Sequence, residues 1–182
     1  MKIQGDKRIS IDIWSDVVCP FCLVGKKKIE QAIIKLNAED QVEIIWHSFQ
    51  LDPDFPLNKS ISSTLYLSEK KGYPVSQINS MQDQLTFNSK SYGIDFEFDK
   101  ALMINTMDLH RLIQWAKTLY KSNELKEAFM TALFCGGLDL SLNETIIDVT
   151  RNVGLDIVKA KEILESEEYK TNVLQDITLS KE

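Results

Sequence analysis

The chain of 182 residues has no long hydrophobic run and no excess of basic residues. A membrane-spanning helix needs about 18 consecutive apolar residues, so we expect no membrane partner. The opening stretch, MKIQGDKRISIDIW, lacks the apolar segment of an export signal. The net charge of −6 argues against a nucleic-acid partner, because surfaces that bind nucleic acid concentrate Lys and Arg. The composition therefore predicts a soluble, cytoplasmic, globular protein.

Cysteine is also scarce, since the chain has only three. That number is too small for a disulfide scaffold, and in a reducing compartment a C-x-x-C pair is more often catalytic or metal-binding than structural. Cys19 and Cys22 form such a pair within SDVVCPFCLVGKKKIEQAI. Cys135 precedes two glycines at the end of an apolar helical pattern, and we interpret it as buried filler.

The region around the pair reads as strand, helix, strand. Residues 9–14 alternate isoleucine with Ser, Asp and Trp, which is the period of a strand with one buried face. An apolar helical periodicity follows the cysteines, and residues 42–50 are rich in β-branched and aromatic side chains. The pattern predicts a βαβ unit with parallel strands and a right-handed crossover.

From residue 58 onward the apolar spacing becomes helical, which predicts an all-helical block inserted after the βαβ unit. Ser141 and Glu144 have the spacing of a capping box for one of its helices. The expected domains are 1–57, a βαβ half; 58–165, the helical insertion; and 166–182, the start of a return helix. The clearest helix, TMDLHRLIQWAKTLYKS, has a predicted buried face made of Leu109, Leu112, Ile113, Ala116 and Leu119.

The position of the pair gives the first cysteine a reason to be reactive. With Cys19 as N-cap, Pro20 becomes the first helical residue, where its missing N–H costs nothing. The Cys19 sulfur then faces the free N–H groups of the first turn and the positive end of the helix dipole, which favours a thiolate. Cys22, one turn along, is better suited to resolve a mixed disulfide. A solvated helix face is expected for the lysines that follow, Lys26, Lys27 and Lys28.

Two other interpretations of the pair are weaker. A zinc site usually needs four ligands, and the remaining candidates, Cys135, His47 and His110, share no ligand spacing, so no metal is predicted. Two buried thiols that pack only as small hydrophobic groups would leave their place between a strand and a helix unexplained.

Three segments in this order resemble the DsbA-like branch of the thioredoxin superfamily, and within it the FrnE-like group. They are SDVVCPFC, then HSFQLDPDFP after the second strand, then INTMDLHRLIQWA. That group is related to 2-hydroxychromene-2-carboxylate isomerases and kappa-class glutathione transferases. The resemblance implies an α/β thioredoxin-like fold with an inserted all-helical domain, and a thiol–disulfide oxidoreductase.

The resemblance also implies roles for particular residues. Cys19 would be the nucleophile and Cys22 the resolving thiol, with Pro20 and Phe21 tuning the pair. The substrate would be a protein or small-molecule thiol or disulfide, with no cofactor, although glutathione is a candidate co-substrate. Asn105 and His110 match positions that lie near the cleft in relatives, and together with Trp14 they are the three candidate pocket residues.

Each of these three also has a purely structural interpretation. Trp14 fits the core, Asn105 fits a helix cap, and His110 fits a packing residue, as does His47 on the second strand. From the residues alone, both readings stay open.

One departure from the family concerns the end of the printed sequence. Relatives continue through a cis-proline loop and two further strands, whereas the four prolines here are Pro20, Pro53, Pro56 and Pro74. We therefore expect a fold without that loop and those strands, and a sheet with an open edge. A fragment, a homodimer or other strand donor, and a degenerate product are the competing explanations. The alternative functions are a glutathione-dependent isomerase or transferase and a redox-inactive interaction module.

Overall fold

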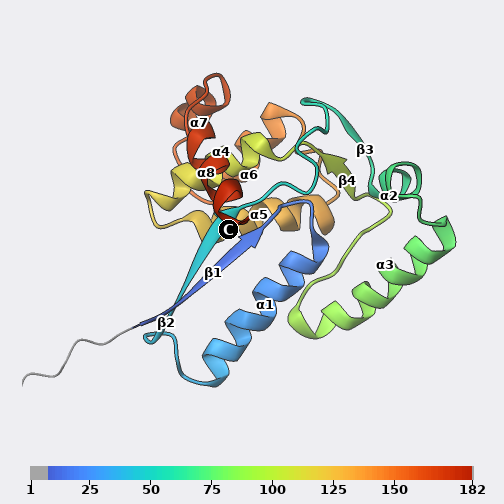
Figure 1. Ribbon diagram of the computed structural model, residues 1–182, viewed down its shortest axis with the longest axis horizontal. Coiled ribbons are helices and arrows are strands. Elements are labelled where there is room, and N and C mark those ends of the chain that lie inside the picture. Colours follow the sequence, from blue (N-terminus) through green and yellow to red (C-terminus); the bar gives the residue numbers. More distant parts are fainter. Residues whose placement is uncertain (1–7, 182) are drawn as a thin grey trace, which may run out of the picture.

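The computed structural model describes residues 8–181 and confirms the predicted βαβ unit (Figure 1). Strand β1 (Ile9–Ser15) pairs in parallel with β2 (Val42–Ser48), and Ile9 lies opposite Val42. Helix α1 (Pro20–Lys35) connects the two strands. Its last turn ends against a short loop that leads directly into β2. No helix within the described part of the chain is long and apolar enough to cross a membrane.

The inserted block is mainly helical, but the prediction that it is entirely helical was wrong. Its segments before α2 and α4 run antiparallel and pair as two short strands, β3 (Ser60–Ser62) and β4 (Leu102–Ile104), which satisfies their backbone groups. The helices after β2 are α2 (Ser63–Lys71), α3 (Val75–Ser89) with the 3-10 turn η1 (Lys90–Tyr92), α4 (Met107–Lys117), α5 (Ser122–Phe134), α6 (Asn143–Asn152), α7 (Ile157–Leu164) and α8 (Lys170–Leu179).

Two local expectations about these helices were also wrong. Helix α4 ends at Lys117, so Leu119 lies in the following loop, half exposed, instead of on the buried face. The capping box predicted for Ser141 and Glu144 does not form, because the Ser141 hydroxyl donates to Asp139 Oδ1 and α6 begins later. In both places the chain forms a loop where the sequence pattern predicts helical structure.

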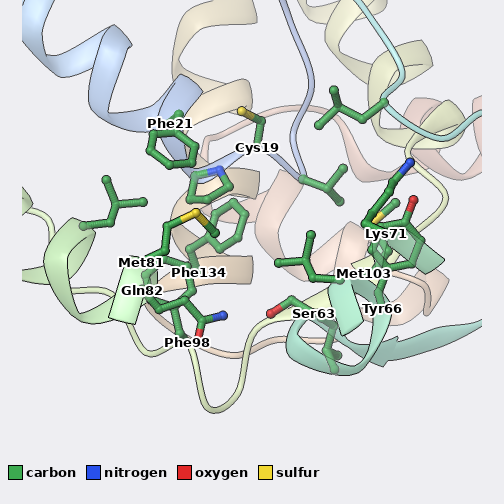
Figure 2. A pocket seen from close by; sticks show the side chains of 16 residues that line it. Cys19, Phe21, Ser63, Tyr66, Lys71, Met81, Gln82, Phe98, Met103 and Phe134 are labelled. Atoms are coloured by element: carbon green, nitrogen blue, oxygen red, sulfur yellow. The ribbon is translucent and has the colours of Figure 1, made fainter. Parts of the chain in front are cut away.

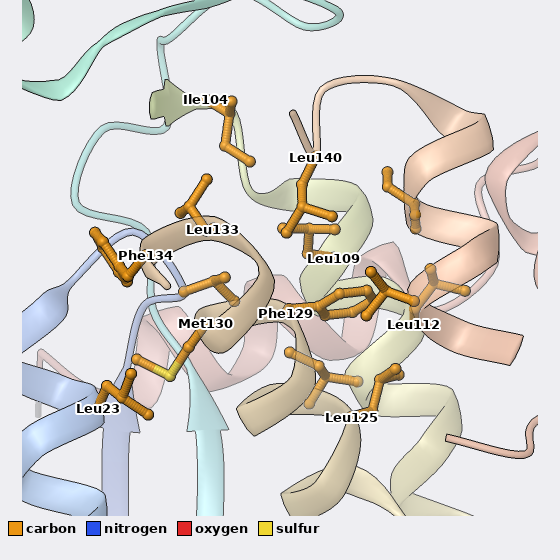
Figure 3. Close-up of a cluster of buried hydrophobic side chains, with 14 of the residues drawn as sticks. Leu23, Ile104, Leu109, Leu112, Leu125, Phe129, Met130, Leu133, Phe134 and Leu140 are labelled. Carbon is orange, nitrogen blue, oxygen red and sulfur yellow. The ribbon is translucent and has the colours of Figure 1, made fainter. Parts of the chain in front are cut away.

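The main core lies where α4 and α5 pack against each other and against the helices around them (Figure 3). Helix α5 also packs on α1, and Leu23 of α1 and Met130 of α5 lie side by side there. Both helices bury leucine and other long apolar side chains at helical spacing, as their sequences predict. Fully buried members of this core include Leu109, Leu112, Leu125, Phe129, Met130 and Leu133.

The far end of the βαβ unit is poorly covered. The side chains of Ile9, at 62% exposure, and Leu36, at 76%, lie open to solvent there, and Ile11 and Ile13 are only half-buried. The alternating isoleucines of β1 therefore form an incompletely covered apolar face, as the sequence predicts for a two-stranded sheet.

Lys26 was expected on a solvated helix face, but the structure buries it. Its ammonium group pairs with Glu30 at 2.6 Å and with Glu127 of α5, and Lys27 pairs with the same Glu127. The reason is the packing of α5 on α1, which covers this side of α1 and supplies the second carboxylate. The lysine cluster thus joins the βαβ unit to the insertion.

Helix α8 contacts the sheet through the carboxylate of Asp176, among other contacts. Asp176 accepts hydrogen bonds from the backbone N–H of Ser48 at 2.8 Å and from Gln114, and it pairs with His47 Nδ1 at 2.8 Å. Burial raises the pKa of Asp176, but the hydrogen bond with His47 and those from Ser48 and Gln114 outweigh burial, so the pKa lies below its ordinary value. The charged carboxylate therefore connects α8, β2 and α4.

Because Phe129 is fully buried in the main core, we expect its truncation to destabilise the protein strongly. Phe129→Ala should lower the free energy of unfolding by about 3–5 kcal/mol, because it leaves a cavity among well-packed side chains. Urea denaturation measures this. Phe87, which is 77% exposed, is the matched control, and Phe87→Ala should change the free energy by less than about 1 kcal/mol. Equal costs for the two variants would contradict the placement of the core.

The contacts of the charged Asp176 carboxylate lead us to expect a loss of stability at acidic pH. Because its folded pKa is depressed, its contribution is present above the unfolded pKa of about 3.9 and is lost as the pH falls through the lower folded pKa. Asp176→Asn should therefore cost about 1–3 kcal/mol near neutral pH, and less as the pH approaches about 3. Urea denaturation across this pH range measures the difference. Exposed Asp83→Asn should give no such pH-dependent difference.

Candidate functional site

Cys19 lies between the end of β1 and the start of α1, as predicted. It is the N-cap of α1 with an extended backbone, φ −109° and ψ 104°, and Pro20 is the first helical residue. The backbone N–H of Cys22 donates to Cys19 O at 3.1 Å. The Cys19 side chain makes no capping hydrogen bond, so its sulfur remains available to other partners.

The two cysteines form a close, unbonded pair. Both are free thiols, and they approach to 3.0 Å. A hydrogen bond between the two sulfurs raises the pKa of Cys19 and lowers the pKa of Cys22 to about 6. Since the groups share one proton, the easy ionisation belongs to the pair. The pair is therefore a monoanion near neutral pH.

The assignment of the thiolate to Cys19, which the sequence suggested, stays a prediction. After the hydrogen bond from Cys19, the pKa of Cys22 is lowered by the Ser15 hydroxyl, by the Asp16 backbone N–H and by the positive charge of Lys126, which together outweigh the effect of burial. The helix dipole acts on the whole first turn and does not distinguish strongly between the two sulfurs. These groups therefore favour ionisation of the pair as a whole.

The two sulfurs differ in their access to the pocket. Cys19 lines a pocket of about 260 Å³, whereas Cys22 packs against the main core and does not line this pocket. Figure 2 shows Cys19 at the edge of the pocket beside Phe21, with Tyr66, Met103 and Lys71 across from them. Cys19 is thus the sulfur that an incoming molecule meets.

The pocket lies between the start of α1 and the insertion. Most of its walls are apolar, and they come from α1, α2, α3 and the end of α5, together with β4. At its edge the Lys71 ammonium lies 5.7 Å from the centre of the Tyr66 ring. The Tyr66 hydroxyl donates to Asp52 at 2.8 Å. Burial and this carboxylate raise the pKa of Tyr66 to about 12, so the hydroxyl stays protonated.

The buried carboxylate of Asp16, which was not among the residues predicted from the sequence, supports the site. Asp16 Oδ1 accepts from the backbone N–H of Val17 at 2.7 Å and lies 3.1 Å from His110 Nε2. Asp16 Oδ2 accepts from the N–H of Leu51 at 2.7 Å. The only hint in the sequence was that Asp16 stands three residues before the N-cap and is followed by two valines. The Asp16 carboxylate joins the end of β1, the segment after β2, and α4.

The three candidate pocket residues lie outside the lining of this pocket. Trp14 stacks on His47 with ring centres 4.4 Å apart, and its Nε1 donates to Asp176 O at 2.8 Å. Asn105 accepts from the N–H of Met107 at 2.9 Å, near the start of α4, and its amide donates to Phe55 O at 2.5 Å.

His110 is buried and, within the described part of the chain, contacts the site through its hydrogen bond with Asp16. Pro20 and Phe21 do line the pocket, beside Cys19. The structure therefore groups Cys19, Pro20, Phe21 and Cys22 at one place, and Trp14, Asn105 and His110 lie outside the pocket lining. Within residues 8–181, no cluster of three or more His, Cys, Asp or Glu is placed to hold a metal ion.

The βαβ unit, the free thiol pair at the start of its helix and the mainly helical insertion together define a dithiol protein with a thioredoxin-like fold. The chain belongs to the DSBA-like thioredoxin domain family, whose model matches residues 10–182. This confirms the resemblance to DsbA-like proteins and the predicted fold class.

Three known proteins show how far the similarity extends. A probable DsbA oxidoreductase from Streptomyces coelicolor is 27% identical with a TM-score of 0.88, over 93% of this chain and 73% of that one. The uncharacterized protein YwbO of Bacillus subtilis is 26% identical over 89% of this chain and 74% of its own. A 2-hydroxychromene-2-carboxylate isomerase shares the fold, with 11% identity and a TM-score of 0.66, over 94% of this chain and 79% of that one. Proteins named for oxidoreductase and for isomerase chemistry thus share this fold.

The role of Asp16 leads to a prediction about the support of the site. In Asp16→Asn, an amide NH₂ replaces one of two oxygens that accept backbone N–H groups, which should cost about 1–3 kcal/mol of unfolding free energy. Amide hydrogen exchange should accelerate at Val17 or Leu51, whichever loses its acceptor. Exposed Asp83→Asn is the control. Unchanged exchange at both amides would contradict the role assigned to Asp16.

Proposed function

We propose that the protein is a thiol–disulfide oxidoreductase that acts through Cys19 and Cys22. The observation that carries the proposal is the division between the two sulfurs: Cys19 opens onto the pocket, and Cys22 lies 3.0 Å away against the core. One sulfur can meet a substrate while the other is held ready to displace it. Family membership supports the same chemistry.

The exchange proceeds in two displacements. The Cys19 thiolate attacks one sulfur of a substrate disulfide, forming a mixed disulfide, and the other substrate sulfur leaves as a thiolate that takes up a proton. The Cys22 thiolate then attacks Cys19, which releases the second substrate sulfur. The substrate disulfide is reduced by two electrons and the protein pair is oxidised to a disulfide. Running the same steps backward oxidises a substrate dithiol.

The pocket suggests what lies beside the reacting sulfur of the substrate. Its apolar walls favour an uncharged aliphatic or aromatic group, in a protein side chain or in a small organic disulfide. No metal or organic cofactor is part of this chemistry, and glutathione would act only as a co-substrate. A reducing compartment such as the cytoplasm is part of the proposal, because it would keep the pair reduced between turnovers.

A second candidate is glutathione-dependent isomerisation or transfer, which the pocket beside Cys19 favours because it has room for a small organic molecule. The apolar walls offer little to the charged ends of glutathione, which makes this the weaker candidate. A redox-inactive module that dimerises through the sparsely covered end of the sheet is the remaining alternative. Light scattering that shows a stable dimer with unreactive cysteines would favour it.

The proposal predicts different outcomes for the two cysteine variants with a chromogenic aromatic disulfide as probe. Cys19→Ser should lose at least about 100-fold in the rate of disulfide reduction, because it removes the accessible nucleophile. Cys22→Ala should release one equivalent of probe thiol and stop at the mixed disulfide, which mass spectrometry detects on Cys19.

Cys135→Ala is the matched control, because Cys135 is the third free thiol and burial raises its pKa. It should keep the wild-type rate. A Cys19→Ser variant that still reduces the probe at the wild-type rate would overturn the proposal. Turnover of a glutathione conjugate that survives Cys22→Ala with no net redox change would establish the second candidate instead.

A further inference from the structure

The pocket beside Cys19 has apolar walls and one positive charge at its edge. Aliphatic, aromatic and thioether side chains make up most of its lining, and such walls favour a compact apolar body. Among the described residues that line the pocket, Lys71 is the one with a positively charged side chain, and no carboxylate lines it. Figure 2 shows Lys71 beside Tyr66 and Met103, across the pocket from Cys19. The pocket thus combines an apolar interior with one positive end.

The charge of Lys71 is not neutralised by a neighbouring acid. Within residues 8–181 its ammonium group forms no ion pair with a carboxylate and lies over the Tyr66 ring, 5.7 Å from the ring centre. A ring face offers a cation only a partial negative charge. Lys71 is also exposed, so its ammonium group can pair with an incoming anion.

Two other polar groups of the wall already have partners. The Tyr66 hydroxyl donates to Asp52 at 2.8 Å, and Asp52 lies outside the lining of this pocket. The Gln82 amide donates to the hydroxyl of Thr64 at 3.2 Å. Of these three groups, Lys71 is therefore the one left to select a ligand by its charge.

The neighbouring lysine of α2 has different surroundings. Lys70 lines a separate hollow together with Asp52 and Asp54, whose negative charges offset its own. The two lysines are both exposed and stand next to each other in the last turn of α2, so they differ mainly in what they face. Lys70 is thus a matched control for the charge of Lys71.

We propose that the pocket binds small organic anions, with a compact apolar body inside the pocket and one anionic group, such as a carboxylate, paired with Lys71. The cavity of about 260 Å³ lies just below the usual range for ligand pockets, about 300–1,000 Å³, so the body is the size of one or two rings. The inference deepens the proposed function and rests on it in one respect: the reacting sulfur of the substrate would face Cys19 from the apolar end. Lys71 is then a specificity-determining residue.

Methionine methyl signals test binding without relying on any activity, because Met81 and Met103 line the pocket whereas Met107 and Met130 do not. The probes are a naphthoate and the matching naphthamide, which share one apolar body and differ in charge. In protein with isotope-labelled methionine methyl groups, both probes should shift the Met81 and Met103 signals. At low ionic strength the naphthoate should bind about threefold more tightly or better, because it alone pairs with Lys71.

Lys71→Met keeps the length of the side chain and removes its charge, so it should abolish the preference for the naphthoate. Lys70→Met should keep that preference. Glutathione has carboxylates but no compact apolar body, and it should bind more weakly than the naphthoate.

Four results would overturn the proposal. They are equal affinities for the two probes in the wild type, a preference that survives Lys71→Met, and glutathione that binds as tightly as the naphthoate. The fourth is the absence of a shift at Met81 and Met103 with either probe, which is the result expected of a pocket that takes only polypeptide segments.

Disulfide exchange separates this inference from the proposed function. If Cys19 is the nucleophile, the probes become a carboxylated aromatic disulfide and an uncharged one. The ratio of their exchange rates should fall about threefold or more in Lys71→Met and keep its wild-type value in Lys70→Met. A preference for the naphthoate in a protein that exchanges no disulfide would leave the anion site standing and remove the oxidoreductase proposal. Exchange at an unchanged ratio in Lys71→Met would remove the anion site from the reaction and keep the oxidoreductase.

Discussion

The site depends above all on the buried carboxylate of Asp16. Its two oxygens hold the N–H groups of Val17 and Leu51 and lie against His110, so three segments far apart in the sequence meet at one side chain. An apolar residue here would leave two buried N–H groups without acceptors, which a folded chain rarely tolerates. The turn that presents Cys19 and the segment that forms one wall of the pocket are both fixed by this contact.

Asp176 makes a second junction of this kind, one turn further along α4. It joins α8 to β2 and α4, as Asp16 joins β1 to the segment after β2 and to α4. Both aspartates lie within the field of Lys126, whose single charge is shared among them and the thiol pair. Neutralising any one of these groups changes the electrostatic potential at the others, because buried charges are poorly screened. The thiol pair is thus one member of a charged network that spans the βαβ unit and the insertion.

The parts of the structure that local rules control were predictable from the sequence. Alternating isoleucines gave β1, and Pro20 directly after Cys19 placed the start of α1. The buried position of Lys126 was not predictable in this way. Lys126 lies 111 residues from Ser15 in the sequence, and its contact exists only because α5 packs on α1.

The same packing buried Lys26, which looks like a surface lysine in the sequence, and the short β3–β4 pair also needed two distant segments to meet. Tertiary contacts decide where these charges lie, and local sequence patterns do not predict such contacts.

The 3.0 Å approach of the two cysteines bears on the order of the chemical steps. Because Cys19 lines the pocket, it meets a substrate first, and a transfer of the shared proton from Cys19 to Cys22 places the charge on the outer sulfur without a second ionisation. Once Cys19 is bonded to a substrate, Cys22 has lost its hydrogen bond with Cys19 and must itself be a thiolate to attack. The ionisation of Cys22 in the mixed disulfide therefore decides whether that disulfide is resolved or persists.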